Sequence, residues 1–83
     1  MTRNTAATGY EPGTVTVTQA LGRLEDIRGL MRDGDVGLAE VERTQLYLDI
    51  LYSLAHSWDF SHKRDMRKLA GIGLDAFRVE PPS

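Results

Sequence analysis

The chain has 83 residues, no cysteine and a formal net charge of −2, with 41% hydrophobic and 27% charged residues. Its length limits it to one domain with a marginal core, and its composition is that of a folded globular domain rather than a disordered chain. Disulfides and thiolate metal sites are excluded, and two histidines offer too few ligands for a metal. We therefore expect no metal and no cofactor.

The net charge gives no general electrostatic reason to bind nucleic acid or an anionic membrane, but the charges are unevenly distributed. Residues 1–60 carry a net charge of −4, whereas residues 61–83 carry +2. No apolar stretch follows the start of the chain, as it would in a signal peptide, and no apolar run approaches the roughly 20 residues of a membrane span. We therefore expect a cytoplasmic protein without membrane contact.

Residues 1–13 are rich in Thr, Ala, Gly and Pro and are expected to form a disordered lead, ahead of a single helical domain over 14–80. The next segment, Thr14–Thr18, alternates Thr and Val with period two. This alternation fits either a short strand that pairs with a partner's strand or an extended arm that enters a helix. Both interpretations stay open at this point.

The first helix is predicted over residues 18–32, with Thr18 as its N-cap and Asp33-Gly34-Asp35 as its end. Its apolar positions step by 3, 4, 3 and 4 and so form one stripe: Val17, Ala20, Leu24, Ile27 and Met31. Because a three-helix chain has a thin core, this heptad-like stripe also suggests a homodimer.

The second helix is predicted over residues 38–58. Apolar residues fill more than half of its circumference from Leu46 onward, so we expect it to be the central element, sandwiched between the other two helices. A narrow polar stripe remains, formed by Glu42, Gln45, Asp49, Ser53 and His56. Arg43 and its neighbours lie on the side that later becomes apolar, so the first turns are expected to protrude from the core.

The third helix is predicted over residues 61–79, either continuous or broken at Gly71 with a last turn that restarts at Leu74. Its expected core face consists of Met66, Leu69, Ala70, Gly73, Ala76 and Phe77. Together the three segments predict an all-α fold, a three-helix bundle with a flexible N-terminal arm.

The run from His62 to Lys68 is the most unusual local feature, because cations in the first turn oppose the helix dipole. It could form a basic surface for phosphate or for an acidic protein, or a solvated face that pairs with the acidic stripe of the second helix. Phe60, beside it, could add an aromatic contact. The candidate partner-binding residues are Phe60, His62, Lys63, Arg64, Arg67, Lys68 and Arg78.

Residues 54–69 resemble a degenerate helix-turn-helix, although Asp65 and Lys68 stand where the motif needs apolar residues. An ordinary corner between two helices is the alternative. Gly71-Ile72-Gly73-Leu74-Asp75-Ala76 fits a dinucleotide fingerprint by letter but follows a helical segment instead of a strand, so we reject that match.

No catalytic set can be argued from these spacings, so we expect no enzyme. The leading hypothesis is a small protein-binding module that acts as an inhibitor or accessory regulator by occupying a partner protein's surface. The alternative is a nucleic-acid-binding regulator that uses the basic face of the third helix.

Overall fold

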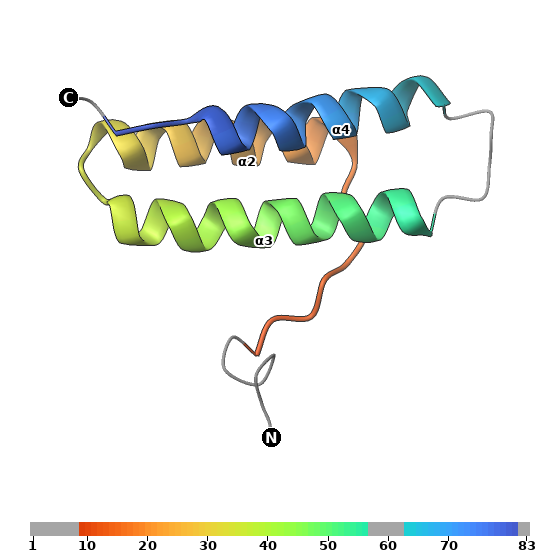
Figure 1. The fold of residues 1–83 in the computed structure, drawn as a ribbon, viewed down its shortest axis with the longest axis horizontal. Coiled ribbons are helices and arrows are strands. Elements are labelled where there is room, and N and C mark those ends of the chain that lie inside the picture. Colours follow the sequence, from red (N-terminus) through yellow and green to blue (C-terminus); the bar gives the residue numbers. More distant parts are fainter. Residues whose placement is uncertain (1–8, 57–62, 82–83) are drawn as a thin grey trace.

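The computed structural model describes residues 9–56 and 63–81 and shows a three-helix bundle (Figure 1). Its helices are α2 (Val17–Arg32), α3 (Val36–Ala55) and α4 (Lys63–Arg78), and the described residues contain no strand. Each helix packs against both of the others. The predicted fold class is confirmed, but the sandwiched arrangement is wrong, because α2 and α4 also contact each other.

Helix α2 begins at Val17, one residue earlier than predicted, and its N-cap is Thr16 instead of Thr18. The Thr16 hydroxyl accepts a hydrogen bond from the Gln19 backbone N–H at 3.1 Å, and the Thr16 N–H donates to the Gln19 side chain at 3.0 Å. This reciprocal capping box satisfies two backbone groups at once, which Thr18 could not do. The arm is therefore extended up to Thr16, and the interpretation of Thr14–Thr18 as a strand is wrong.

The α2 stripe faces the interior, as predicted. Ala20, Leu24, Ile27 and Met31 are buried, and Val17 is half-buried beside them. The helix ends at Asp33, and Gly34 follows with φ +86°, a left-handed conformation that favours glycine. Because the chain's own core covers this stripe, the stripe no longer supports the prediction of a homodimer, which stays untested.

The core side of α3 is narrower than the sequence suggested. Ala39, Leu46 and Ile50 are buried, whereas Leu51 and Tyr52 are exposed. The two neighbouring helices cover one side of α3 and the N-terminal arm crosses another, which leaves Leu51 and Tyr52 exposed. No described helix combines the length and apolar character needed to cross a bilayer.

The N-terminal half of α3 does not protrude, contrary to our expectation. Arg43 forms an ion pair with Glu40, and its guanidinium donates to the Ala76 carbonyl at 3.2 Å and to the Val79 carbonyl at 2.8 Å. These carbonyls belong to the end of α4, where helix acceptors lack partners within the helix. Arg43 therefore fastens the C-terminal end of α4 to α3.

The last helix, α4, is continuous through Gly71. Its buried face is centred on Leu69, Ile72, Gly73 and Ala76, while Ala70 and Phe77, predicted to be buried, are exposed. A Cβ on Gly73 would lie 3.6 Å from the Ile50 side chain, an ordinary van der Waals distance, so Gly73 faces α3. In this orientation of α4, Ile72 is buried in the core and Phe77 is exposed.

Candidate protein interface

Five predicted interface residues lie on α4, and all five are exposed: Lys63, Arg64, Arg67, Lys68 and Arg78. The other two, Phe60 and His62, lie outside the described residues. Since α4 begins at Lys63, three of these cations fall within or just after its first turn, where the helix dipole disfavours them. Asp65 in the first turn offsets part of this effect.

The cations of α4 form two neighbouring rows on its outer side. Residues four apart lie on one helix side, which groups Arg64 with Lys68 and Lys63 with Arg67. Arg78 follows Arg67 by eleven residues, or three turns, and therefore lies on the same side as Arg67. The basic surface thus consists of two adjacent stripes on the outer side of α4, one with Arg67 and Arg78 and one with Arg64 and Lys68.

The stripe with Arg67 and Arg78 lies beside exposed apolar side chains. Leu74 is 58% exposed and Phe77 is 53% exposed, and Leu51 on α3 is 44% exposed. The Phe77 ring packs edge-on against Tyr47 of α3, with 4.6 Å between ring centroids, a favourable aromatic geometry. This contact joins the apolar residues of α3 and α4 into one surface, which we call the α3–α4 flank: Tyr47, Leu51, Ala70, Leu74 and Phe77.

Arg64, Arg67, Lys68 and Arg78 do not pair with the acidic stripe of α3. Arg78 forms an exposed ion pair with Asp75, at 3.7 Å. Arg64, Arg67 and Lys68 form no ion pair with any residue that the structure describes. The prediction of a face neutralised by helix α3 therefore finds no support among the described contacts.

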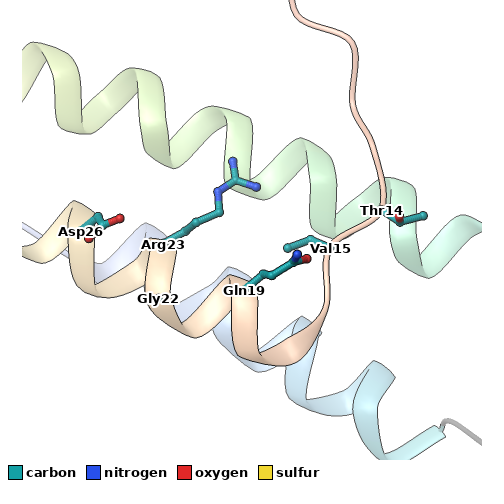
Figure 2. Close-up of a pocket in the computed structure, with 6 residues that line it drawn as sticks. All are labelled: Thr14, Val15, Gln19, Gly22, Arg23 and Asp26. Carbon is teal, nitrogen blue, oxygen red and sulfur yellow. The ribbon is translucent and has the colours of Figure 1, made fainter.

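The end of the N-terminal arm and α2 border an open depression, shown in Figure 2. It is lined by Thr14, Val15, Gln19, Gly22, Arg23 and Asp26. The Gln19 side chain is already used in the capping box, and Arg23 points toward α3 (Figure 2). With its main polar groups engaged within the chain, the depression provides no evident ligand site.

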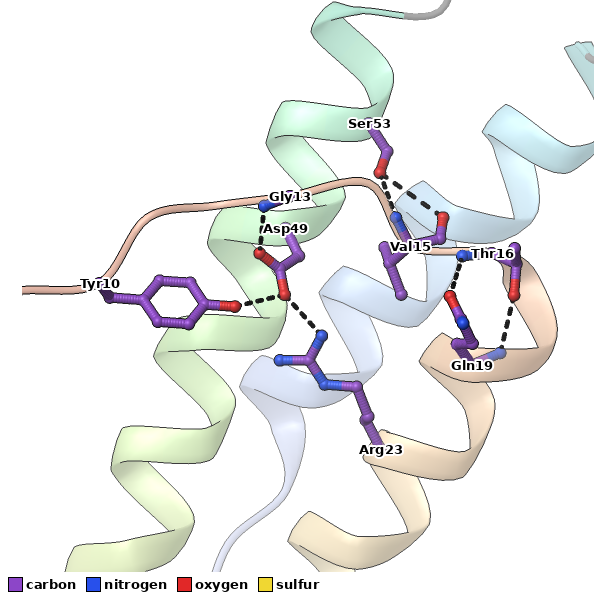
Figure 3. A network of polar contacts seen from close by, with 8 residues as sticks. All are labelled: Tyr10, Gly13, Val15, Thr16, Gln19, Arg23, Asp49 and Ser53. Carbon is purple, nitrogen blue, oxygen red and sulfur yellow. Dashed lines mark hydrogen bonds and ion pairs between the residues drawn. The ribbon is translucent and has the colours of Figure 1, made fainter.

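Asp49 on α3 is the centre of a polar network that joins Arg23 of α2 to the N-terminal arm (Figure 3). The sequence did not predict this network. The Asp49 carboxylate accepts hydrogen bonds from the Tyr10 hydroxyl at 2.5 Å, the Gly13 N–H at 3.0 Å and the Arg23 guanidinium at 2.6 Å. Nearby, Ser53 accepts from the Val15 N–H at 2.8 Å, and the Val15 side chain is buried. The polar stripe of α3 therefore binds the chain's own arm.

The protonation equilibria of these groups reflect that arrangement. Burial raises the pKa of Asp49, but the hydrogen bonds from Tyr10, Arg23 and Gly13 outweigh it, and the net effect is a lowered pKa. Burial and the adjacent carboxylate raise the pKa of Tyr10. Burial lowers the pKa of Arg23, yet its contacts with Asp49 and Tyr10 leave it raised overall. Asp49 is thus held ionised, as a structural anchor.

The α3–α4 pair is not arranged as a helix-turn-helix. Figure 1 shows α3 and α4 running alongside each other in opposite directions, whereas that motif crosses its helices steeply. Its predicted turn lies in residues 57–62, outside the described part. Among the described residues, no group of three His, Asp or Glu side chains is placed to hold a metal ion.

Comparison with known protein families, curated proteins and solved structures finds no match. Function must therefore be inferred from the surfaces themselves. Sequence reasoning located the cations but missed Leu74 and Leu51, and it placed Phe77 in the core. The available signal was Ile72, whose alternative place in the stripe would have rotated α4 and moved Phe77 outward.

Proposed function

We propose that this chain is a small, non-enzymatic protein-binding module that acts as an inhibitor or accessory regulator by occupying an acidic surface of a partner through α4. The observation that carries the proposal is the set of exposed cations Arg64, Arg67 and Lys68, which form no ion pair within the described residues. A charge that contributes little within the chain is available for contact with another molecule.

Two features favour a protein partner. First, Arg64 lies in the first turn of α4, where a cation opposes the helix dipole, so its charge does not stabilise the helix and an external contact would account for its position. Second, Leu74 and Phe77 are exposed on the same helix, and apolar side chains next to arginine are typical of protein interfaces. Nucleic acid would engage the charges but gain little from these apolar groups.

The test uses a triple variant, Arg64→Gln/Arg67→Gln/Lys68→Gln, as bait in an extract of the source cells. We expect the native chain to retain a protein that the triple variant loses, with and without nuclease treatment. The control, Arg28→Gln/Arg32→Gln, removes two exposed cations from α2 and should retain that protein. Retention by the triple variant, or loss of capture after nuclease treatment, would contradict the proposal.

The triple variant must also fold. Exposed substitutions usually change stability by no more than about 0.5 kcal/mol each, so thermal unfolding followed by circular dichroism should be close to that of the native chain. A strongly lowered melting temperature would mean that the cations stabilise the fold, and capture would then be repeated with Arg67→Gln alone.

A further inference from the structure

The α3–α4 flank is an apolar surface that no described segment covers, with arginines along its α4 side. Its large exposed side chains are Leu51, Leu74 and Phe77. Ala70, Leu74 and Phe77 follow each other at steps of four and three, so they form a ridge along α4. Tyr47 and Leu51 are four residues apart and form the facing ridge on α3, joined to the first by the contact between Tyr47 and Phe77.

The charges along the α4 side of this surface are basic, while Glu40, seven residues before Tyr47 on α3, is paired with Arg43. Arg67 lies one turn before Ala70, and Arg78 lies one turn after Leu74, so the ridge of α4 has an arginine at each end. Arg67 has no ion-pair partner among the described residues, and Arg78 shares only an exposed contact with Asp75, which contributes little. Arg64 and Lys68, in contrast, lie on the other stripe of α4.

Resting on the protein-binding function above, we propose that the α3–α4 flank receives an amphipathic helix that carries acidic residues beside its apolar ridge. Such a helix would place its ridge over Leu51, Leu74 and Phe77 and its carboxylates near Arg67 and Arg78. The span from Arg67 to Arg78 is about 17 Å at 1.5 Å per residue, which matches three turns of a bound helix.

This occupant follows from the shape and the charge together. Ridges at steps of three and four residues are the pattern against which another helix packs, and helices commonly bind such surfaces through anchors at those steps. Arginine pairs with carboxylates in a bidentate geometry, so the flanking charges favour a partner with Asp or Glu. A basic helix would be repelled by the same two arginines.

The probes are two synthetic 18-residue helical peptides with the same Leu/Phe ridge, one flanked by Glu and one by Lys. Each is titrated into the full-length, ¹⁵N-labelled chain and followed by NMR. We expect the Glu peptide to shift the amide signals around Leu51, Leu74 and Phe77 in a saturable way, and the Lys peptide to bind at least about tenfold more weakly. Equal binding of both peptides, or no shifts with the Glu peptide at millimolar concentration, would overturn the proposal.

Matched variants locate the binding site. Arg67→Gln/Arg78→Gln and Arg64→Gln/Lys68→Gln remove the same charge from different stripes of α4. The first pair should weaken binding of the Glu peptide about tenfold, and the second by less than about threefold, since rim charges away from an interface contribute little. Equal losses would mean that charge alone attracts the peptide, and the proposed flank would be wrong.

A second matched pair tests the apolar ridge. Leu74 is 58% exposed and Leu38 is 52% exposed, so Leu74→Ser and Leu38→Ser should both leave the fold intact. The first should weaken binding of the Glu peptide and the second should not. Signals of the flank that move with protein concentration alone would identify a second copy as the occupant, against the proposal.

The two proposals fail in different ways. If the Glu peptide does not bind but Arg64→Gln/Arg67→Gln/Lys68→Gln still loses its cellular partner, the flank is wrong while the protein-binding function stands. If that triple variant retains every partner, the proposed protein-binding function is wrong, regardless of whether the peptides bind.

Discussion

Asp49 on α3 and Arg67 on α4 are both charged side chains on helices, yet their surroundings are opposite. Asp49 is 4% exposed and accepts three hydrogen bonds from the arm and α2. Arg67 is exposed and forms no ion pair among the described residues. The difference arises because the arm crosses α3 near Asp49, whereas no described segment covers the outer side of α4, where Arg67 lies.

This comparison separates charges that fold the chain from charges available to a partner. Burying a carboxylate is costly unless its hydrogen bonds are satisfied, so Asp49 requires the arm and Arg23 in their present positions. The exposed arginines of α4 place no such demand on the rest of the chain. A substitution of Asp49 should therefore lower the stability of the fold, whereas substitutions of the exposed arginines of α4 should leave it nearly unchanged.

The largest effect is expected for Asp49→Asn. The amide cannot form the ion pair with Arg23 and makes weaker hydrogen bonds with Tyr10 and Gly13. Hydrogen bonds to charged groups contribute about 1.5–3 kcal/mol, so we expect a loss of about 2–3 kcal/mol in the free energy of unfolding, measured by urea denaturation. The control Asp26→Asn changes an exposed carboxylate and should have little effect. Equal losses of unfolding free energy in the two variants would show that the buried Asp49 stabilises the fold no more than an exposed carboxylate does.

The free energy of unfolding should also depend on pH through the titration of Asp49. The pKa of Asp49 is lowered in the folded chain, so its stabilising contribution is fully present above its unfolded pKa of about 3.9. That contribution is lost as the pH falls through the folded pKa. The stability difference between the native chain and Asp49→Asn should therefore shrink on acidification, as unfolding curves from about pH 6 to pH 2 would reveal. A difference independent of pH would argue against an ionised Asp49.

A smaller loss is expected for Tyr10→Phe, which removes the hydroxyl that donates to Asp49 at 2.5 Å. Gly13 and Arg23 still bind the carboxylate, so the cost should be about 1 kcal/mol. Amide exchange at Gly13 and Val15, whose N–H groups are bound in the folded chain, should accelerate. Unchanged exchange at both residues would mean that Tyr10 does not hold the arm.

The smallest effect is expected for Gly71→Ala, and it should be stabilising. Gly71 lies on the exposed side of α4, and a Cβ there would meet no atom within 4 Å. Alanine is favoured over glycine within a helix by about 0.5–1 kcal/mol, so the melting temperature should rise slightly. A fall would indicate that the helix breaks at Gly71 after all.

Local patterns identified most of the fold. The stripe of α2, the stop at Gly34 and the apolar character of α3 each follow from residues close in sequence, and each is seen in the structure. The errors occur where distant residues decide. The rotation of α4 about its axis, which turns Gly73 toward Ile50 of α3, decides whether Phe77 is buried.

The candidate site was predicted in part for the same reason. Arg64, Arg67 and Lys68 could be named because charge is visible in the sequence. Their division into two stripes also follows from helical spacing, but which stripe borders exposed apolar residues depends on the packing of α3 against α4. Leu51 could not have been assigned, since its apolar helix gave no indication of which side faces solvent.

By itself, the sequence determined three helices, the turn at Gly34 and an α4 rich in cations, because hydrophobic periodicity, capping and charge act over a few residues. The tertiary structure decided that Asp49 is a buried anchor instead of a solvated carboxylate, and that Leu51, Leu74 and Phe77 form one exposed surface. Both outcomes depend on contacts between segments more than 25 residues apart, for which the local pattern contains no signal.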